Sequence, residues 1–456
     1  MDSKEYIRDL VCKARAAQMK YEQFNQQQVD AVVREIAKVI YDNADELARM
    51  AVGETRMGVF EDKIKKNQGK ARIIWDYLKT KKSVGIIQAY EETGIVEIAR
   101  PMGVVGAVTP CTNPIVTPMC NAMFALKGRN AIIIAPHPRA KKCAKVVVEL
   151  FNKAIVKYDV PENLIQVLDE PSVELTSELM KAVDVIVATG GMGMVKAAYS
   201  SGIPAYGVGV GNVQCIIDRD VDIKEAVPKI IAGRIFDNGI ICSGEQSIVV
   251  PEEDYGKIID EFKSNGAYYI EDKEEKIKLS KTLFPDGVMN KDLVGQSIKK
   301  IAELSGIKVP EDTKVILVKA EGIGKDDILS KEKMCPVITV FKYKEFHEAV
   351  TIAQANLDVE GRGHSVSIHS NNKNNIEYAA DILTVSRVLI NQICSTMNGG
   401  SFYNGLTPTT TLGCGSWGNN SISENFDYKH LMNITRIAYY NKDASVPTDD
   451  EIWAVK

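Results

Sequence analysis

Residues 131–157 read AIIIAPHPRAKKCAKVVVELFNKAIVK, and this stretch decides the fold. Its first five residues are apolar and rich in Ile, as in a short buried strand. After a Pro-His-Pro turn, apolar residues recur with helical spacing from Ala140 to Lys157. A buried strand followed by an amphipathic helix is the repeating unit of a parallel sheet whose faces are covered by helices.

The same alternation continues along the chain in two series. The first series predicts strands at 164–168, 183–188 and 214–218 and helices at 173–182 and 192–201. The second predicts helices at 222–236 and 253–265 and strands at 246–250 and near 315–318, 337–341 and 364–368. We therefore expect two α/β domains, joined near residue 220.

The flanking segments differ from this rhythm. Residues 4–50 and 60–80 have helical spacing, whereas 84–102 predicts a β-hairpin that leads into a buried strand ending at Thr109. Residues 398–419 are Gly-rich and loop-like, as in a segment that lies over a site. The stretch 430–440 predicts a terminal strand, and the early hairpin is its expected partner.

Composition restricts the class of ligand. The chain has 456 residues, 45% of them apolar and 25% charged, with a net charge of −4. This balance gives no overall attraction to nucleic acid or to an anionic membrane, so a small or medium-sized ligand is expected. The charged start and the lack of any apolar run of about 18 residues predict a cytoplasmic protein. Nine scattered cysteines without a CxxC pair indicate neither a metal site nor a disulfide framework.

Two turns carry residues suited to catalysis. Cys242 lies in Asn238-Gly-Ile-Ile-Cys-Ser-Gly, between a predicted helix and a strand, where a thiol is held firmly yet remains reachable. The alternative is a buried structural cysteine. Asn113 directly follows a strand and precedes Pro114, so its amide could donate to a developing oxyanion. The alternative is an Asx-turn, which is the more frequent role of such an Asn when it is taken alone.

Glycine-rich turns and two histidines suggest a nucleotide site. Thr189-Gly-Gly191 ends a strand and opens a helix, so its N–H groups could receive a pyrophosphate, although the spacing is not that of GxGxxG. Gly207-Val-Gly-Val-Gly211 permits close approach of a flat ligand. His137 and His364 could contact a ribose, act as bases or fill the core. The basic run 127–145 suits a phosphorylated ligand or a solvated surface.

The order of these motifs resembles the aldehyde dehydrogenase superfamily from about residue 5 to residue 445. Six segments resemble its coenzyme A (CoA)-acylating branch, including the aldehyde dehydrogenase half of the bifunctional aldehyde-alcohol dehydrogenases. They are Thr112-Asn-Pro114, Pro136-His-Pro-Arg-Ala-Lys141, Ala188-Thr-Gly-Gly191, Asn238-Gly-Ile-Ile-Cys242, Gly363-His-Ser365 and Thr411-Leu-Gly-Cys-Gly-Ser-Trp-Gly418.

The resemblance implies a role for each matching residue. Cys242 would be the nucleophile that forms a thiohemiacetal and then a thioester, and Asn113 would stabilise the oxyanion. His364 would assist transfer of the acyl group to CoA. NAD is expected rather than NADP, with CoA as co-substrate, although His137 stands where hydrolytic relatives use Lys to hold the ribose. The implied cofactor-binding residues are Thr112, His137, Thr189, Gly190, Gly191, Gly209, Gly211 and Glu332.

One departure from hydrolytic relatives concerns water. Those relatives place a glutamate base where this chain has Gly207. Without that carboxylate, no base is available to activate water, so the thioester can wait for a thiol. The resemblance therefore implies reversible conversion of a short-chain aldehyde and CoA into an acyl-CoA.

The expected aldehyde is sulfoacetaldehyde, because residues 109–119 and 409–417 resemble the acylating sulfoacetaldehyde dehydrogenases. A sulfonate needs a cation close to Cys242, and Arg234 and Arg362 are the candidates, although surface ion pairs are the more frequent fate of arginine. Acetaldehyde, propanal and butanal are alternative substrates. A scaffold that kept the fold without activity and a phosphate-linked reductase remain competing classes.

The resemblance also implies the α/β architecture in detail. We expect a variant Rossmann cofactor domain (1–83 and 103–220), a catalytic domain with Cys242 (221–429), and an oligomerisation sheet with a C-terminal tail (84–102 and 430–456). The predicted assembly is a homodimer or homotetramer.

Overall fold

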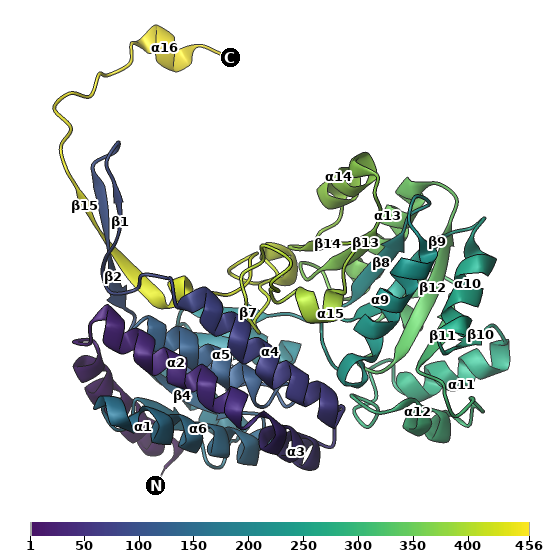
Figure 1. The fold of residues 1–456 in the computed structure, drawn as a ribbon, viewed down its shortest axis with the longest axis horizontal. Coiled ribbons are helices and arrows are strands. Elements are labelled where there is room, and N and C mark those ends of the chain that lie inside the picture. The colour runs from purple at the N-terminus through teal and green to yellow at the C-terminus, as the bar shows by residue number, and fades with distance from the viewer. Residues whose placement is uncertain (1, 456) are drawn as a thin grey trace.

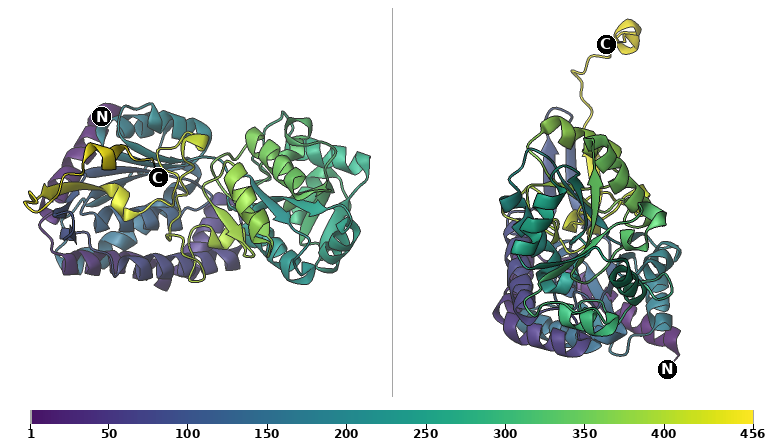
Figure 2. Two further views of the ribbon diagram at one scale, coloured as in Figure 1. Left: turned by 90° about the horizontal axis from the view of Figure 1, so that it is seen from above. Right: turned by 90° about the vertical axis from the view of Figure 1, so that its right-hand side faces the viewer.

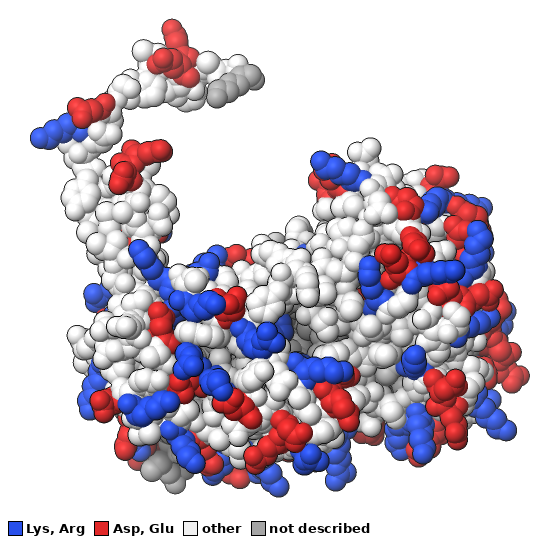
Figure 3. Space-filling model, viewed as in Figure 1, with Lys and Arg blue, Asp and Glu red and all other residues white. Residues whose placement is uncertain are grey.

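The computed structural model describes residues 2–455 and contains two α/β bodies side by side. A small antiparallel sheet and a C-terminal arm project from the first body (Figures 1 and 2). On the face shown in Figure 3, acidic and basic side chains are mixed over most of the surface. No described helix is both long and apolar enough to cross a bilayer.

The first body is built on a five-stranded parallel sheet with the order β5-β4-β3-β6-β7. The chain runs outward from β3 through β4 to β5 and then returns to the other side of β3 as β6. Such a reversal opens a crevice at the carboxyl ends of the two strands, where α/β folds place ligands. The strands are β3 Val104–Thr109, β4 Ala131–Pro136, β5 Ile165–Val167, β6 Val185–Thr189 and β7 Ala205–Val208.

Helices cover both faces of this sheet. Apolar side chains of strands and helices form one continuous buried core, as the alternating pattern predicts. The helices are α1 Ser3–Tyr21, α2 Gln26–Asp42, α3 Ala44–Thr55, α4 Phe60–Leu78, α5 Val116–Lys127, α6 Lys141–Ile155, α7 Val173–Ala182 and α8 Met192–Tyr199.

The second body has a seven-stranded sheet with the order β10-β11-β12-β9-β8-β13-β14, parallel throughout. Its strands are β8 Val213–Ile217, β9 Glu245–Pro251, β10 Ala267–Ile270, β11 Val315–Lys319, β12 Val337–Tyr343, β13 Val366–His369 and β14 Val388–Ile390. Its helices are α9 Ile223–Ile235, α10 Tyr255–Ser264, α11 Lys273–Leu283, α12 Ile298–Ser305, α13 Phe346–Val359, α14 Lys373–Ile382 and α15 Cys394–Met397.

The change from one sheet to the other occurs earlier than expected. β8 pairs with β9 and β13, so the connection between the sheets runs through residues 209–212 and not near 220. The prediction placed β8 in the first domain because its strand–helix rhythm continues that of the preceding elements. Rhythm alone does not tell which sheet a parallel strand joins.

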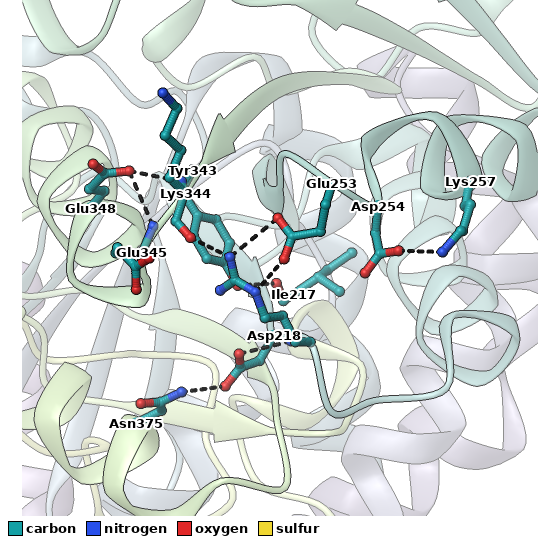
Figure 4. A network of polar contacts seen from close by, with 11 residues as sticks. Ile217, Asp218, Glu253, Asp254, Lys257, Tyr343, Lys344, Glu345, Glu348 and Asn375 are labelled. Carbon is teal, nitrogen blue, oxygen red and sulfur yellow. Dashed lines mark hydrogen bonds and ion pairs between the residues drawn. The ribbon is translucent and has the colours of Figure 1, made fainter.

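The carboxyl edge of the second sheet carries a network of polar contacts (Figure 4). Tyr343, at the end of β12, donates a hydrogen bond to the carbonyl of Ile217 at the end of β8, over 3.1 Å. Arg219 pairs with Glu253 beyond the end of β9. The opposite, amino edge of the second sheet faces the first body, since Asp237, which precedes β9, pairs with Lys63 and Lys66 of α4.

The hairpin and the terminal strand form a separate three-stranded sheet, which confirms their predicted pairing. β1 Gly85–Tyr90 and β2 Ile95–Pro101 form the antiparallel hairpin. β15 Met432–Ala438 runs antiparallel along β2, from Met432 opposite Pro101 to Ala438 opposite Ile95. Beyond it, an exposed arm ends in the short helix α16 Asp449–Trp453 (Figure 1).

Candidate active site

A cavity of about 410 Å³ lies at the junction of the two bodies. It is lined by residues of α4, by the turns after β3 and before β9, and by the Gly-rich segment after α15. We call it the junction cavity. Its polar and reactive lining residues include Lys65, Lys66, Lys70, Arg72, Asn113, Cys242, Ser243, Ser395, Thr396, Thr409 and Thr410.

The cavity brings together the two catalytic residues predicted from the turns. Asn113 follows β3 in the first body, and Cys242 precedes β9 in the second. Among residues 2–455, no Asp or Glu lines the junction cavity. A thiol and an amide therefore face a shared space that contains no carboxylate base.

Close packing fixes the Cys242 turn. A Cβ atom on Gly211 would lie 1.9 Å from the carbonyl oxygen of Cys242, so only glycine fits where the β7–β8 connection passes this turn. Burial raises the pKa of the Cys242 thiol to about 12; Glu332 and Cys414 add to the rise and Arg387 opposes it. The free protein thus holds Cys242 as a thiol at neutral pH.

Asn113 is oriented by a lysine of α4. The Nζ atom of Lys66 donates to Oδ1 of Asn113 over 2.8 Å, and the same ammonium pairs with Asp237. The amide nitrogen of Asn113 has no hydrogen-bond acceptor within the described chain. It is therefore available to a ligand oxygen in the junction cavity.

His364 lies just before β13, at the amino edge of the second sheet, and does not line the junction cavity. Its Nδ1 is 3.1 Å from Oγ of Ser365, and its buried Nε2 has no partner among the described residues. Burial, reinforced by Arg387, lowers the pKa of the imidazole to about 3. His364 is therefore neutral at pH 7, and its Nε2 is available for a hydrogen bond.

The predicted nucleotide turn lies at the reversal between β3 and β6. β6 ends at Thr189, and α8 begins after Gly191, whose N-cap position carries no side-chain cap. A Cβ atom on Gly191 would meet nothing within 4 Å, so the backbone there is open to a ligand. Thr112 is on the turn after β3. These features fit a dinucleotide phosphate at a strand–helix turn.

His137 and Glu332 occupy the other predicted cofactor positions. His137 is exposed after β4, and its Nδ1 accepts from the backbone N–H of Arg139 over 3.1 Å. Glu332 is buried with Oε1 unpartnered among residues 2–455, and burial, with Glu360, raises its pKa well above the usual range. It borders a second cavity of about 160 Å³. An unpartnered buried carboxyl oxygen suits a hydroxyl group such as that of a ribose.

The structure does not bring the two predicted anion-binding arginines to the junction cavity. Arg234 is fully buried and donates to backbone carbonyls, including those of Cys335 at 2.8 Å and Lys333 at 3.1 Å. Arg362 is half-exposed and pairs with Asp358 at 3.6 Å. Both predictions assumed that an arginine close in sequence to Cys242 or His364 would place its guanidinium in the junction cavity. The structure shows that neither does.

The glycines between β7 and β8 have different surroundings. Gly207 is inside β7, and a Cβ atom there would lie 2.7 Å from Val195 and 2.8 Å from Tyr199 of α8. A side chain at this position would push Val195 or Tyr199 aside, so Gly207 allows the close packing of β7 against α8. A Cβ atom on Gly209 would lie 3.8 Å from the sulfur of Cys414.

Sequence reasoning missed the basic residues of α4. Lys70 projects into the cavity wall and donates to the carbonyls of Gly399 at 2.7 Å and Thr409 at 3.2 Å. Burial of its ammonium lowers the pKa to about 8. Neither Lys70 nor Arg72 has a carboxylate partner among the described residues. The signal was present as Lys66 and Lys70, one helical turn apart on the predicted helix 60–80, but the sequence did not show what packs against them.

No group of three or more His, Cys, Asp or Glu side chains that could hold a metal ion occurs within residues 2–455.

Lys and Arg side chains are visible along α4 in Figure 3, where this helix approaches the second body. The site therefore combines a thiol, an amide and several cations from α4.

Known proteins share this architecture. The aldehyde dehydrogenase family model matches residues 1–275. The succinate-semialdehyde dehydrogenase (acetylating) of Clostridium kluyveri is 55% identical over 453 residues, which cover 99% of this chain and 100% of the relative. The sulfoacetaldehyde dehydrogenase of an Acholeplasma species is 42% identical, with 98% and 93% covered.

A solved structure shows the same similarity over the whole chain. The crystal structure of an acetylating aldehyde dehydrogenase from Geobacillus thermoglucosidasius has a TM-score of 0.94, 38% sequence identity and 98% coverage of both chains. These similarities extend over both α/β bodies and over the cavity between them. The chain belongs to the aldehyde dehydrogenase family, in its acylating branch.

Proposed function

We propose that Cys242, Asn113 and His364 convert an aldehyde and CoA into an acyl-CoA, reversibly and with NAD(P). The observation that carries this proposal is that Cys242 and Asn113, from different bodies, face one cavity that no carboxylate lines among the described residues. Solved relatives hold bound CoA with an acylated cysteine in one case and NADP⁺ in another.

The first step forms a bond between carbon and sulfur. The Cys242 thiol first loses its proton to solvent. The thiolate then attacks the carbonyl carbon of the aldehyde, and the carbonyl electron pair moves to oxygen. The amide N–H of Asn113 and the backbone N–H of Cys242 donate to that oxyanion. When the C=O bond re-forms, hydride leaves the carbon and a thioester remains on Cys242. The nicotinamide cofactor, when bound, accepts this hydride.

The second step transfers the acyl group to CoA. Neutral His364 accepts a hydrogen bond from the CoA thiol, the thiol proton leaves to solvent, and the resulting thiolate attacks the thioester carbon. The bond from that carbon to the sulfur of Cys242 then breaks, which regenerates the nucleophile. CoA is favoured over water because no carboxylate in the described lining can activate water.

The best-supported aldehyde carries an anion. Lys70 places its ammonium in the cavity wall with two backbone carbonyls and no described carboxylate partner. A partly buried cation of this kind is compensated by an anionic ligand. The two relatives compared above are named for succinate semialdehyde and sulfoacetaldehyde, both of which carry one. We propose succinate semialdehyde first and sulfoacetaldehyde second, ahead of acetaldehyde, propanal and butanal.

The test is reduction of NAD or NADP, followed at 340 nm, with each of these aldehydes and with or without CoA. Reduction that requires CoA, is fastest with an anionic aldehyde and disappears in Cys242→Ala is the expected result. Equal rates without CoA would show that water is the acceptor. No turnover of any aldehyde would favour a scaffold without activity.

The predicted homodimer or homotetramer stays a prediction. Its support is the three-stranded sheet that stands away from the first body, with exposed Ile86 on β1 and exposed Tyr439 and Tyr440 just after β15. Light scattering on the purified protein would measure the mass of the assembly.

A further inference from the structure

A buried ion cluster links the two halves of the candidate active site. Lys66 of α4 contacts both Asn113, after β3, and Asp237, five residues before Cys242. We infer that Lys66 is a positioning residue, which aims the Asn113 amide at the oxyanion and holds it in register with the Cys242 turn. This inference rests on the oxyanion role proposed for Asn113.

The chemistry of the ammonium fixes the orientation of the amide. Nζ of Lys66 is 2.8 Å from Oδ1 of Asn113. An ammonium donates hydrogen bonds and cannot accept them, so the amide must turn its oxygen to Lys66. Its NH2 group then points away from Lys66, and it has no acceptor within the described chain. Asn113 is thereby prepared to donate and cannot rotate without losing a charge-assisted bond.

Asp237 in turn holds Lys66 in place. The Asp237 side chain is fully buried and that of Lys66 is 9% exposed. Oδ1 of Asp237 accepts from the backbone N–H of Val59 over 2.8 Å, and Oδ2 pairs with Lys63 at 3.0 Å as well as with Lys66. The backbone N–H of Asp237 donates to Asp62 over 2.9 Å. The carboxylate is thus fixed by several independent contacts.

The backbone around Asp237 packs tightly against the start of α4. Asp237 and Asn238 adopt left-handed φ angles of 53° and 54°, uncommon for residues other than glycine. A Cβ atom on Gly58 would lie 2.0 Å from Oδ1 of Asp237, so α4 approaches it through a glycine. The turn that leads to Cys242 is therefore fitted to the start of α4.

The cluster also favours negative charge in the cavity. Lys63 and Lys66 both pair with Asp237, while the nearby Asp62 pairs with Lys65, so three ammonium groups and two carboxylates leave one net positive charge in this region. A cation bonded to the amide oxygen draws electron density from the nitrogen and strengthens its N–H groups as donors. The effect is largest when the carbonyl oxygen gains charge, so it should appear in kcat more than in KM.

The experiment measures kcat and KM for Lys66→Met and Lys66→Arg with succinate semialdehyde and with butanal. We expect Lys66→Met to lower kcat roughly ten- to hundredfold with both aldehydes and to change KM less than about threefold. Lys66→Arg, which retains the charge and donors, should recover most of kcat. The matched control is Lys79→Met, since Lys79 directly follows α4 and pairs at the surface with Asp76.

A double-mutant cycle separates positioning from an independent role. If Lys66 acts through Asn113, then Lys66→Met in an Asn113→Ala background should lower kcat by less than about threefold further. Effects that multiply fully would overturn the inference. So would a loss confined to the anionic aldehyde, because it would mean that Lys66 binds the substrate anion directly.

Two further measurements test whether Lys66→Met alters the reactivity of Cys242 or the stability of the fold. The alkylation rate of Cys242 by iodoacetamide should match wild type in Lys66→Met, since it does not depend on an oxyanion donor. The thermal midpoint should fall, because the buried carboxylate of Asp237 loses one of its two cations, and the kinetics are measured well below that midpoint. If this variant does not fold, Lys66→Gln, which retains a donor without the charge, enters the same cycle. Wild-type protein without CoA-dependent activity would defeat the proposed function itself, whereas an active wild type with an equally active Lys66→Met defeats only this inference.

Discussion

The Nζ atom of Lys70 lies 2.7 Å from the carbonyl oxygen of Gly399, in the wall of the cavity that also contains Cys242. The contact ties α4 of the first body to the Gly-rich segment after α15. It also directs a cation toward the space where an aldehyde substrate would be held.

Lys70→Met should therefore change substrate preference. We expect kcat/KM for succinate semialdehyde to fall roughly ten- to hundredfold, the worth of a hydrogen bond to a charged group. The value for butanal should change by less than about threefold. Steady-state kinetics at 340 nm checks both, with Lys79→Met as the control. Equal losses with the two aldehydes would contradict a role in binding the anion.

The raised pKa of Cys242 predicts a pH profile for the free protein. Because burial raises this pKa to about 12, the thiolate fraction is small at pH 7 and grows tenfold with each pH unit up to that value. The rate of iodoacetamide modification at Cys242 should rise in the same proportion from pH 7 to pH 9. Mass spectrometry with Cys242→Ala as background would measure it. A plateau below pH 8 would show that the thiol is activated before any ligand binds.

The lowered pKa of His364 predicts an effect on one half-reaction. With a pKa of about 3, the imidazole is deprotonated from pH 5 upward, so its protonation should produce no acid limb in CoA-dependent turnover between pH 5 and pH 7. His364→Ala should slow that turnover roughly a hundredfold. The first burst of reduced cofactor in rapid mixing should remain. Loss of the burst would place His364 in the first step.

Arg234 should matter for stability and not for substrate preference. Its guanidinium is fully buried and satisfies carbonyls of Cys335, Lys333 and others. Arg234→Leu leaves these acceptors unpaired and should lower the free energy of unfolding by about 3 kcal/mol or more. Denaturant titration measures this loss. The ratio of kcat/KM values for sulfoacetaldehyde and butanal should stay unchanged in any folded fraction; a selective loss for sulfoacetaldehyde would restore Arg234 to the anion site.

The sequence predicted those features that depend on local pattern. Strand–helix alternation located the elements of both sheets. Asn113 and Cys242 were found because each lies on a turn next to a strand, where a side chain is held firmly yet remains reachable. Assignment of β8 to its sheet was not predictable in this way, since both sheets are parallel and equally apolar. It depends on long-range pairing with β13.

The surroundings of the basic side chains could not be predicted from the sequence. Arg234 and Lys70 are both basic residues on helices, yet one is satisfied by buried carbonyls and the other reaches a cavity. Helical spacing gives the face of a helix on which a side chain lies, but not what packs against that face. Only the docking of the second body onto α4 determines that Lys66 and Lys70 line a site.

The pairing of β15 with β2 limits how much of the protein can fold while it is still being translated. The hairpin of β1 and β2 leaves the ribosome early, but its partner strand is at residues 432–438. Until then one edge of β2 has open N–H and C=O groups, and such an edge invites pairing with other chains. The nascent protein must keep that edge protected through the translation of the whole second body, so its final strand closes the fold.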